Sequence, residues 1–498
     1  MVNRKILTVL GCVLTHFTIG TIYCTGNIMP YVTSYIFLKD ESVTMASMTI
    51  VFYICILTYA LSFQINNLIQ SRYTPKKSIY AGAVLYVIVV FVTAACQNRI
   101  AIIIIYGILL GCGSGIAYPA ALMIAISCYP DRKGLITGIV VGSFAVGAFC
   151  FNFIATGIVN PENVKPYSRV VSGGKTEKFF EESIAKNVPK MFLILAAIYT
   201  VQLTIALFLI QDIDVKAVNA AAAAAAAKPQ EPITVKDNDS PKNKKRTTAD
   251  SNNLKIMGKD DEDADSQSEN SDQQEPNENS DLEVQDQEKK TEYKRIQTLI
   301  INPDVNLTVT QVFMTRQFHQ IFWCFILSGT AGLFAVASFK TIGIKYGYDD
   351  AFLTLTGSLG SILNGTMRPL WGMLFDKTSF RFVYLVILIT QIIMCVTFPE
   401  VSKFKPAFLI WLVILFVCSG GHFTLLAPTA VRIYSRITGG KVYSYFIIAM
   451  GLASMCVYFI QVYATVKLEP SVFFYILTGL SFCSLVSTIF FSEVLKVQ

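Results

Sequence analysis

Twelve long, almost uninterrupted apolar stretches constrain the fold of this chain more than any other feature. The first six cover residues 6–36, 45–69, 79–96, 101–128, 135–159 and 191–210. After a long polar segment, six more cover residues 318–342, 351–375, 382–398, 408–434, 442–466 and 472–491. Each is close to the ~20 residues that a helix needs to cross a hydrocarbon core. A backbone in lipid must satisfy its own hydrogen bonds, and these runs are continuous rather than alternating, so we expect twelve membrane-spanning α-helices.

The grouping of the stretches predicts an all-α membrane protein with two six-helix lobes. The lobes are expected at residues 1–211 and 316–498, joined by a cytosolic linker at 212–315. The linker contains an alanine tract at 220–227, then Lys-, Asp-, Glu-, Ser-, Asn- and Gln-rich sequence, and ends in a short amphipathic lead-in to the seventh span. Such a composition cannot bury enough apolar surface to offset chain entropy, so we expect disorder.

The basic residues of the short loops predict the orientation. They fall on one side if the span count is right, and they are Arg4, Lys5, Arg72, Lys76, Lys77, Arg132, Lys133, Lys377, Arg381, Arg436 and Lys441. The positive-inside rule makes that side cytosolic, together with both termini. These loops also account for the net charge of +7 without any nucleic-acid partner. The sequence leaves open whether the membrane is the plasma membrane or that of an organelle.

The composition argues against enzyme chemistry. The chain has twelve cysteines, most of them in apolar stretches, and their spacing forms neither a metal site nor a disulfide framework. Three histidines and no acidic cluster in the spans leave no hydrolase triad and no metal centre. A Walker loop, which ATP-driven pumping requires, is also missing. We therefore expect no enzyme activity, no cofactor and no metal.

Three sequence blocks resemble the major facilitator superfamily. The first is Gly-x-Gly-x-Gly-Ile-Ala-Tyr-Pro at 111–119, and the second is Tyr-Pro-Asp-Arg-Lys-Gly-Leu-Ile-Thr-Gly at 129–138. The third, Asn-Gly-Thr-Met-Arg-Pro-Leu-Trp-Gly followed by Asp-Lys, lies at 364–377. More narrowly, the chain looks like the oxalate/formate antiporter family and its relatives, the monocarboxylate transporters. This resemblance implies two lobes around a central cavity that opens alternately to either side.

Arg368 is the candidate substrate anchor. It lies inside the eighth span, where an arginine costs at least ~2.5–3.5 kcal/mol and should face a cavity or a partner. Its planar guanidinium matches a carboxylate with two parallel hydrogen bonds. The alternative is a side chain that snorkels toward the cytosolic interface. The resemblance favours the first, because an arginine at this place is the family's carboxylate anchor.

Departures from the family pattern narrow the expected substrate. The oxalate transporters carry a second cation in the eleventh helix, where this chain has Met450. The animal monocarboxylate carriers place an aspartate four residues before the arginine, where this chain has Asn364, and a lysine in the first helix, which this chain lacks. The assigned spans contain no Asp or Glu, so a proton relay has no obvious carrier. These absences favour recognition of a monocarboxylate by one arginine, with anion exchange or facilitated diffusion.

Other polar residues in the spans are candidates for the cavity wall or for proton coupling. Tyr23, Asn27, Tyr118, Asn364 and His422 are predicted to complete the substrate site. His16 and His422 titrate in the right range to carry a coupling proton, although lone helical histidines are usually packing residues. Lys340, near the outer end of the seventh span, either attracts anions at the mouth or snorkels to the interface.

Together these observations predict a monomeric, multi-pass transporter whose partners are a small organic anion and the lipid bilayer. The alternative from another class is a non-transporting membrane receptor or scaffold that signals through the long linker. Catalysed flux of a labelled monocarboxylate would distinguish the two, because a receptor binds without transport.

Overall fold

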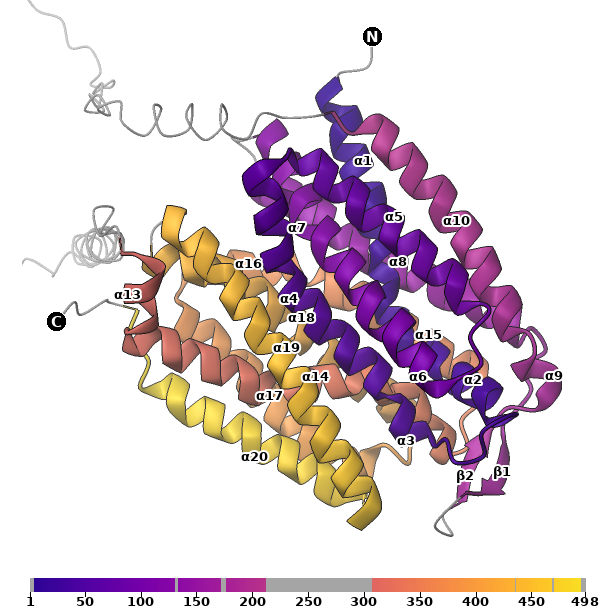
Figure 1. Ribbon diagram of the computed structural model, residues 1–498. Helices are drawn as coiled ribbons and strands as arrows, with labels where there is room; N and C mark the ends of the chain where they lie inside the picture. Colours follow the sequence, from indigo (N-terminus) through magenta and orange to yellow (C-terminus); the bar gives the residue numbers. More distant parts are fainter. Residues whose placement is uncertain are drawn as a thin grey trace, which may run out of the picture. The chain divides into compact units, whose positions relative to one another are not determined.

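The computed structural model describes residues 4–129, 133–171, 176–211, 307–434, 436–467 and 470–493. Long helices make up most of these residues, and both halves of the chain belong to one compact unit (Figure 1). The predicted all-α membrane fold is confirmed. Most of the predicted linker, residues 212–306, lies outside the described residues, so its expected disorder stays a prediction.

The first lobe contains six membrane crossings. The first runs through α1 (Arg4–Ile19), the short 3-10 helix η1 (Gly20–Cys24) and α2 (Thr25–Phe37). The others are α3 (Met45–Met48) with α4 (Ile50–Arg72), α5 (Pro75–Thr93), α6 (Arg99–Ile102) with the π-helical η2 (Ile103–Leu109) and α7 (Leu110–Cys128), α8 (Lys133–Val159), and α9 (Glu182–Ala185) with α10 (Val188–Leu209).

The second lobe repeats this plan. A short helix, α13 (Val309–Phe313), stands where the sequence predicts the lead-in, and the Thr308 side chain caps it. The crossings are α14 (Arg316–Lys345), α15 (Asp350–Thr366) with α16 (Arg368–Lys377), α17 (Phe380–Val401), α18 (Lys405–Tyr434), α19 (Arg436–Lys467) and α20 (Pro470–Ile489).

The eighth crossing differs from its predicted span, 351–375. Among the described residues, eleven helical stretches are long and apolar enough to span a membrane, and this crossing is not one of them. It is rich in Gly, Ser and Thr, and it is divided at Met367 into α15 and α16. Pro369 has no N–H to donate, so the regular ladder is interrupted next to Arg368. The crossing also begins at Asp350, one residue before the predicted start, because the Asp349 side chain accepts a hydrogen bond from the Phe352 N–H and caps α15.

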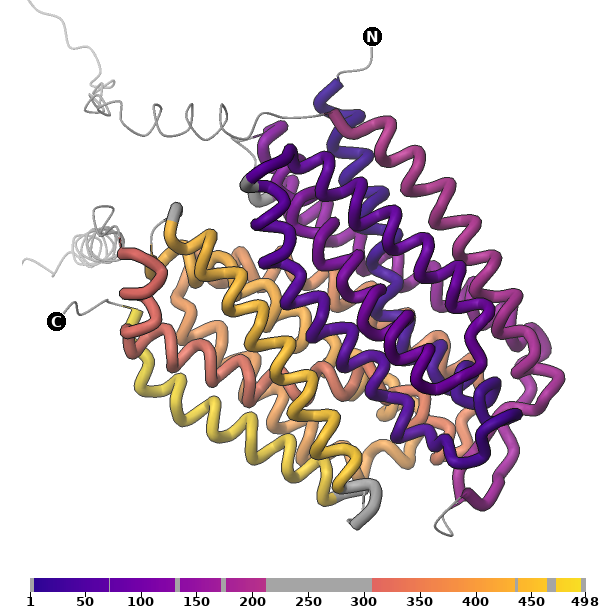
Figure 2. Tube along the Cα trace, in the orientation of Figure 1, coloured from indigo at the N-terminus to yellow at the C-terminus, as the bar shows by residue number. Residues whose placement is uncertain are grey.

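The two lobes pack against each other along two seams. In one, α4 runs beside α19, and in the other α8 packs against α15 and α2 against α14 (Figure 2). Glycine permits the closest approaches. A Cβ at Gly26 would meet the Val336 carbonyl, and one at Gly365 would meet the Ala145 side chain. Lipid offers no hydrophobic drive for helix association, so such close packing stabilises the seams.

A two-stranded hairpin marks one end of the bundle, which we call the hairpin end. Strands β1 (Tyr167–Val170) and β2 (Thr176–Phe179) are antiparallel, with Tyr167 opposite Phe179. The ammonium of Lys178 donates to the Ile344 carbonyl at 2.7 Å, near the end of α14. The hairpin therefore contacts the second lobe, although it belongs to the loop between the fifth and sixth crossings.

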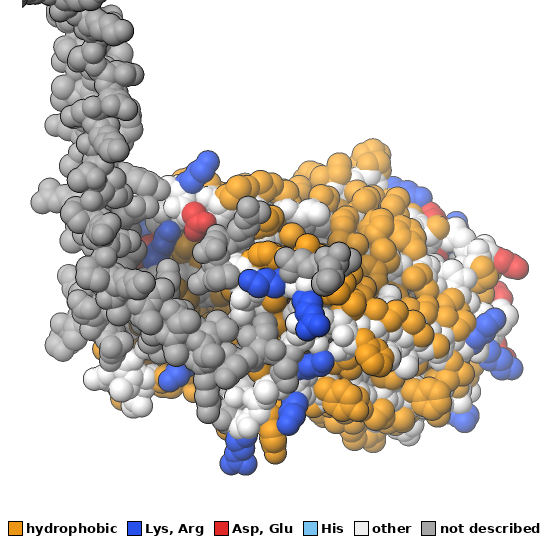
Figure 3. Space-filling model, turned by 90° about the horizontal axis from the view of Figure 1, so that it is seen from above, with side chains coloured by type: hydrophobic (Ala, Val, Ile, Leu, Met, Phe, Trp, Pro, Cys, Tyr) orange, Lys and Arg blue, Asp and Glu red, His pale blue; other side chains and the backbone are white. Residues whose placement is uncertain are grey.

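The opposite end of the bundle carries exposed basic side chains with few acidic ones, whereas the hairpin end carries both, such as Arg99, Lys165 and Lys403 with Glu162 and Glu400. The exposed basic residues described at the opposite end are Arg4, Lys5, Arg72, Lys77, Arg316, Lys377, Arg381 and Lys441, which all lie near helix ends there. Figure 3 views this end, where blue Lys and Arg side chains stand among apolar ones. The lateral helix surfaces carry exposed apolar residues such as Phe208 and Phe459, as contact with lipid requires.

Candidate functional site

Arg368 lies at the break between α15 and α16, and its side chain is directed into the protein. The residue is 9% exposed. One terminal nitrogen, Nη2, donates to Asn364 Oδ1 at 3.0 Å, whereas Nε is buried without a hydrogen-bond partner. No acidic side chain in the described part of the chain forms an ion pair with it. The Arg368 side chain therefore does not snorkel to the membrane interface, because its guanidinium is buried.

A small cavity lies beside this guanidinium, between the lobes. Its lining residues are Ile22, Tyr23, Ile56, Tyr59, Tyr118, Phe144, Arg368 and Phe423. The first six belong to the first lobe, and the last two belong to the second. Apart from Arg368, the lining is aliphatic or aromatic, with tyrosine hydroxyls as its other polar groups. A site of this composition suits a small ligand with one anionic group and an apolar body.

Aromatic contacts fix the tyrosines of the cavity. The rings of Tyr23 and Phe144 meet edge to face with centroids 5.2 Å apart, and Tyr118 meets Phe144 at 5.9 Å. The Tyr23 and Tyr118 side chains line this cavity together with Arg368. These two tyrosines and Arg368, which were predicted as site residues from the sequence, are therefore brought together.

Asn364 supports the arginine without cancelling its charge. Its amide nitrogen donates to the Phe416 carbonyl at 2.7 Å, which turns Oδ1 toward Arg368. A carboxylate here would neutralise the guanidinium, whereas an amide supplies a hydrogen bond and leaves the positive charge in place. The charge is consequently available to an anion in the cavity.

The two candidate histidines occupy different places. His16 packs on the Tyr118 ring, with centroids 4.4 Å apart, directly behind the cavity wall. Its Nδ1 donates to the Cys12 carbonyl at 3.1 Å, and its Nε2 is buried without a hydrogen-bond partner. His422 is not among the cavity residues. It packs against Phe325 and Tyr384 and donates from Nε2 to Gln391 Oε1 at 3.1 Å.

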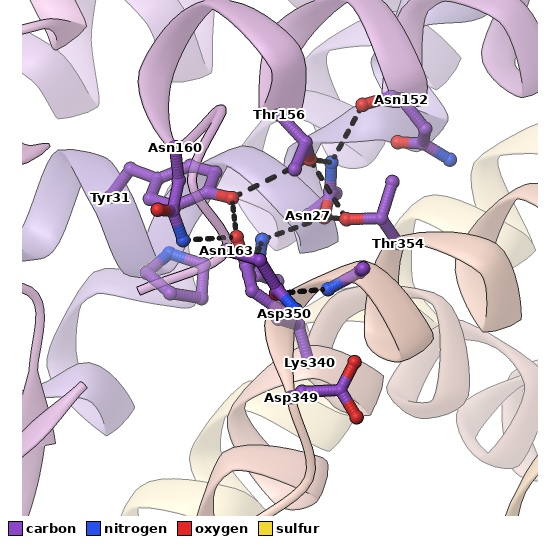
Figure 4. A network of polar contacts seen from close by, with 12 residues as sticks. Asn27, Tyr31, Asn152, Thr156, Asn160, Asn163, Lys340, Asp349, Asp350 and Thr354 are labelled. Carbon is purple, nitrogen blue, oxygen red and sulfur yellow. Dashed lines mark hydrogen bonds and ion pairs between the residues drawn. The ribbon is translucent and has the colours of Figure 1, made fainter. Parts of the chain in front are cut away.

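Asn27 is also absent from the Arg368 cavity, and it belongs to a second polar cluster. Its Oδ1 accepts from Lys340 Nζ at 2.9 Å, and its Nδ2 donates to Thr156 at 3.0 Å (Figure 4). Lys340 in turn forms an ion pair with Asp350 at 2.7 Å, and both side chains are 0% exposed. Lys340 thus neither snorkels nor faces the mouth as a free cation, because it has a buried counter-ion.

Asp350 corrects the prediction that the eighth span lacks an acidic residue. Its neighbour Asp349 faces outward, caps α15 and pairs with Lys405 at 2.6 Å. Partial burial tends to raise the pKa of the Asp349 carboxyl, but the hydrogen bonds from Lys405 and the Phe352 N–H outweigh it and hold the pKa below its usual range. The sequence feature that indicates a buried carboxylate here is the Asp349-Asp350 pair at a helix start. The first residue caps the helix, and the second turns inward.

Comparisons with known proteins agree with this architecture. The family model of the Major Facilitator Superfamily matches residues 12–455. Apicoplast pyruvate carrier 1 of Toxoplasma gondii is 23% identical over 235 residues, which are 39% of this chain and 43% of the carrier. The oxalate:formate antiporter of Oxalobacter formigenes is 26% identical over 157 residues, or 31% of this chain and 38% of the antiporter. The chain thus matches less than half the length of each of these relatives.

Solved structures show the same fold at low sequence identity. The xylose transporter XylE from E. coli, in a partially occluded inward-open conformation, aligns with a TM-score of 0.59 and 11% identity over 97% of this chain and 98% of that one. The nucleoside transporter NupG aligns with a TM-score of 0.57 and 10% identity over 98% of this chain and 99% of that one. At these identities the likeness concerns the fold alone.

Proposed function

Because the chain belongs to the Major Facilitator Superfamily and is a membrane transporter rather than an enzyme, we propose that it carries small organic anions. Monocarboxylates are the best-fitting class, and Arg368 is the carboxylate anchor in an alternating-access cycle. The observation that carries this proposal is a buried guanidinium with a neutral hydrogen-bond partner, beside a cavity shared by the two lobes. A buried cation of this kind requires an anion to compensate it.

The charge balance favours a single carboxylate over a dianion. Lys340 and Arg368 are the two buried cationic side chains among the described residues, and Lys340 is already neutralised by Asp350. Asp350 and Arg368 also lie 18 positions apart along one nearly continuous crossing, which corresponds to roughly 27 Å of helix. A small dicarboxylate cannot reach both cations, so one anchor is left for the substrate.

The similarity to a carrier of pyruvate and to an antiporter of oxalate and formate supports a small carboxylate as the substrate. The basic end of the bundle is proposed to face the cytosol, by the positive-inside rule, and the hairpin end to face away from it. Exchange was expected over proton symport because the predicted spans contain no acidic residue. Asp350 removes that premise, so the proposal covers both secondary active and facilitative transport.

The test is uptake of labelled pyruvate, formate and oxalate by purified protein in liposomes. Wild-type protein is expected to transport at least one of the monocarboxylates, and Arg368→Ala should lower its kcat/KM about 100-fold or more, since hydrogen bonds to a charged group contribute roughly 3 kcal/mol. Arg368→Lys should restore little, because a point charge lacks the planar fork.

Arg381→Ala is the matched control, because Arg381 is exposed at the start of α17 and remote from the cavity lining. It should transport like the wild type. Full activity in Arg368→Ala would refute the anchor. Substrate binding by wild-type protein without catalysed flux would instead favour the receptor alternative.

A further inference from the structure

The cluster around Lys340 and Asp350 is the largest group of buried polar side chains outside the Arg368 cavity. Besides the ion pair, Asp350 Oδ2 accepts from the Tyr31 hydroxyl and, at 2.7 Å, from Asn160 Nδ2. Lys340 Nζ lies 3.8 Å from the centre of the Tyr31 ring and donates to Asn27. Thr156 and Thr354 join the same cluster through their hydroxyls, 2.8 Å apart (Figure 4).

The members of this cluster are divided between the lobes in a specific way. Both charges come from the second lobe, with Lys340 on α14 and Asp350 at the start of α15. The neutral partners Asn27 and Tyr31 come from α2 of the first lobe, and Asn160 directly follows α8. The ion pair therefore stays within one lobe, while its hydrogen bonds and the Tyr31 ring contact cross the seam.

This division has a consequence for movement of the lobes. If the lobes separate at the hairpin end, the cross-seam contacts break, but neither charge loses its counter-ion. Lys340 and Asp350 then form hydrogen bonds with water in place of those with Tyr31, Asn160 and Asn27. A separation that left one charge buried without its partner would be far more costly, because the penalty for an unpaired buried charge exceeds that for a lost neutral hydrogen bond.

We propose that this cluster is the gate of the hairpin end. The preformed Lys340–Asp350 pair is the fixed element, and Tyr31, Asn27 and Asn160 are the residues that bind it and hold the two lobes together there. Its contacts set the equilibrium between closed and open hairpin ends. The proposal concerns the movement and does not depend on which substrate Arg368 binds.

Two neighbouring contacts cross the same seam and support the gate. The Asn163 side chain accepts a hydrogen bond from the Ala351 N–H at 2.8 Å, next to Asp350. Lys178 of the hairpin bonds to the Ile344 carbonyl on the last turn of α14. Both use first-lobe loop residues to bind the ends of α14 and α15, so the seam is closed from the ion pair to the surface of the bundle.

Tyr31→Phe tests the gate most directly. It removes the hydroxyl that donates to Asp350 but keeps the ring against Lys340, so folding should be maintained. Hydrogen–deuterium exchange of the full chain in lipid nanodiscs reports opening at the hairpin end. Exchange in α2 and in the first turns of α15 should rise roughly 10- to 100-fold, as loss of a hydrogen bond to a carboxylate predicts.

Tyr384→Phe is the matched control. Tyr384 is also fully buried, and its hydroxyl bonds to Ser328 at 2.6 Å, but both residues belong to the second lobe. It should leave exchange in α2 and α15 unchanged. If both variants raise exchange there equally, or if Tyr31→Phe raises none, the gate is refuted.

A second variant changes the ion pair itself. The double substitution Lys340→Met with Asp350→Asn leaves no charge in this cluster, so the chain can fold, but it weakens the hydrogen bonds that Tyr31 and Asn160 form with residue 350. It should raise exchange in the same segments as Tyr31→Phe. Unchanged protection in this double variant would show that the charges have no part in closing the hairpin end.

Discussion

At the scale of single residues, two buried cations among the described residues have different partners. Arg368 has an amide partner and a free Nε beside a cavity, whereas Lys340 forms an ion pair with the carboxylate of Asp350. The partner decides the role in each case. A neutral partner leaves the charge available for an anionic ligand, and a charged partner makes the pair a structural unit that other residues can bind.

The ion pair predicts that a single substitution of Lys340 or Asp350 destabilises the protein much more than substitution of both. Asp350→Asn leaves the buried ammonium without a counter-ion and should destabilise the protein by about 3–5 kcal/mol. Addition of Lys340→Met should recover most of this loss, because the charge is then removed as well. The measurement is the thermal unfolding midpoint of purified protein in detergent, compared among the wild type, both single variants and the double variant. If the unfolding midpoint fell equally in the single and double variants, the two charges would not compensate each other.

The sequence singled out Arg368 because a cation inside an apolar span stands out, and the family resemblance favoured the anchor over a snorkelling side chain. Asp350 was left outside the eighth span, which was predicted to begin one residue later. Its burial depends on Tyr31 and Asn160, which are far away along the chain and meet it only in the fold. Asn27 was predicted to belong to the substrate site. Its partner Lys340 is far from it along the chain, so the sequence does not show their contact.

At the scale of helices, two glycines of α8 differ in how closely a neighbouring helix approaches them. A Cβ at Gly147 would collide with the Phe17 carbonyl of α1, because the two helices meet there backbone to backbone. At Gly142 a Cβ would meet nothing within 4 Å. Both glycines lie in the same apolar stretch of the sequence, which does not show that only Gly147 lies on the contact with α1.

These glycines give a matched pair of variants. Gly147→Ala should destabilise the protein by about 1–3 kcal/mol through overpacking, because the colliding atom belongs to the backbone and cannot move aside. Gly142→Ala should be neutral or slightly stabilising, because alanine is the better helix former. Thermal unfolding in detergent measures both. The packing of α1 on α8 would need revision if Gly142→Ala were the more harmful change.

The helix order was predictable from hydropathy, but two local features were not. The break at Met367 follows from a proline that a hydropathy pattern counts as part of the span. The β1–β2 hairpin lies in a loop where no apolar stretch marks it, and its contacts with α14 depend on the packing of the lobes. Both features lie beside a proposed site. The break at Met367 is next to Arg368, and the hairpin contacts the seam near Asp350.

At the scale of the whole molecule, both proposed sites lie where the two lobes meet. The Arg368 cavity draws its lining from both lobes, so it can change its access when the lobes rock. The Lys340 cluster lies at the hairpin end and crosses the same seam. In this arrangement the hairpin end is closed, and the proposed cycle requires its opening while the opposite end closes.

The linker is the part of the chain that this cycle should not need. Deletion of residues 220–288 is expected to leave transport and folding largely intact, because such polar, acidic sequence contributes few packed contacts. The parts that remain, 212–219 and 289–306, can extend over about 80 Å at ~3.3 Å per residue, so the deletion still leaves a long connection between α10 and α13. Labelled monocarboxylate uptake in liposomes and the unfolding midpoint measure the two effects, and Arg368→Ala in the deleted chain is the negative control. A deleted chain that unfolds at the wild-type temperature but transports nothing would show that the linker takes part in transport, because loss of folding could not explain the result.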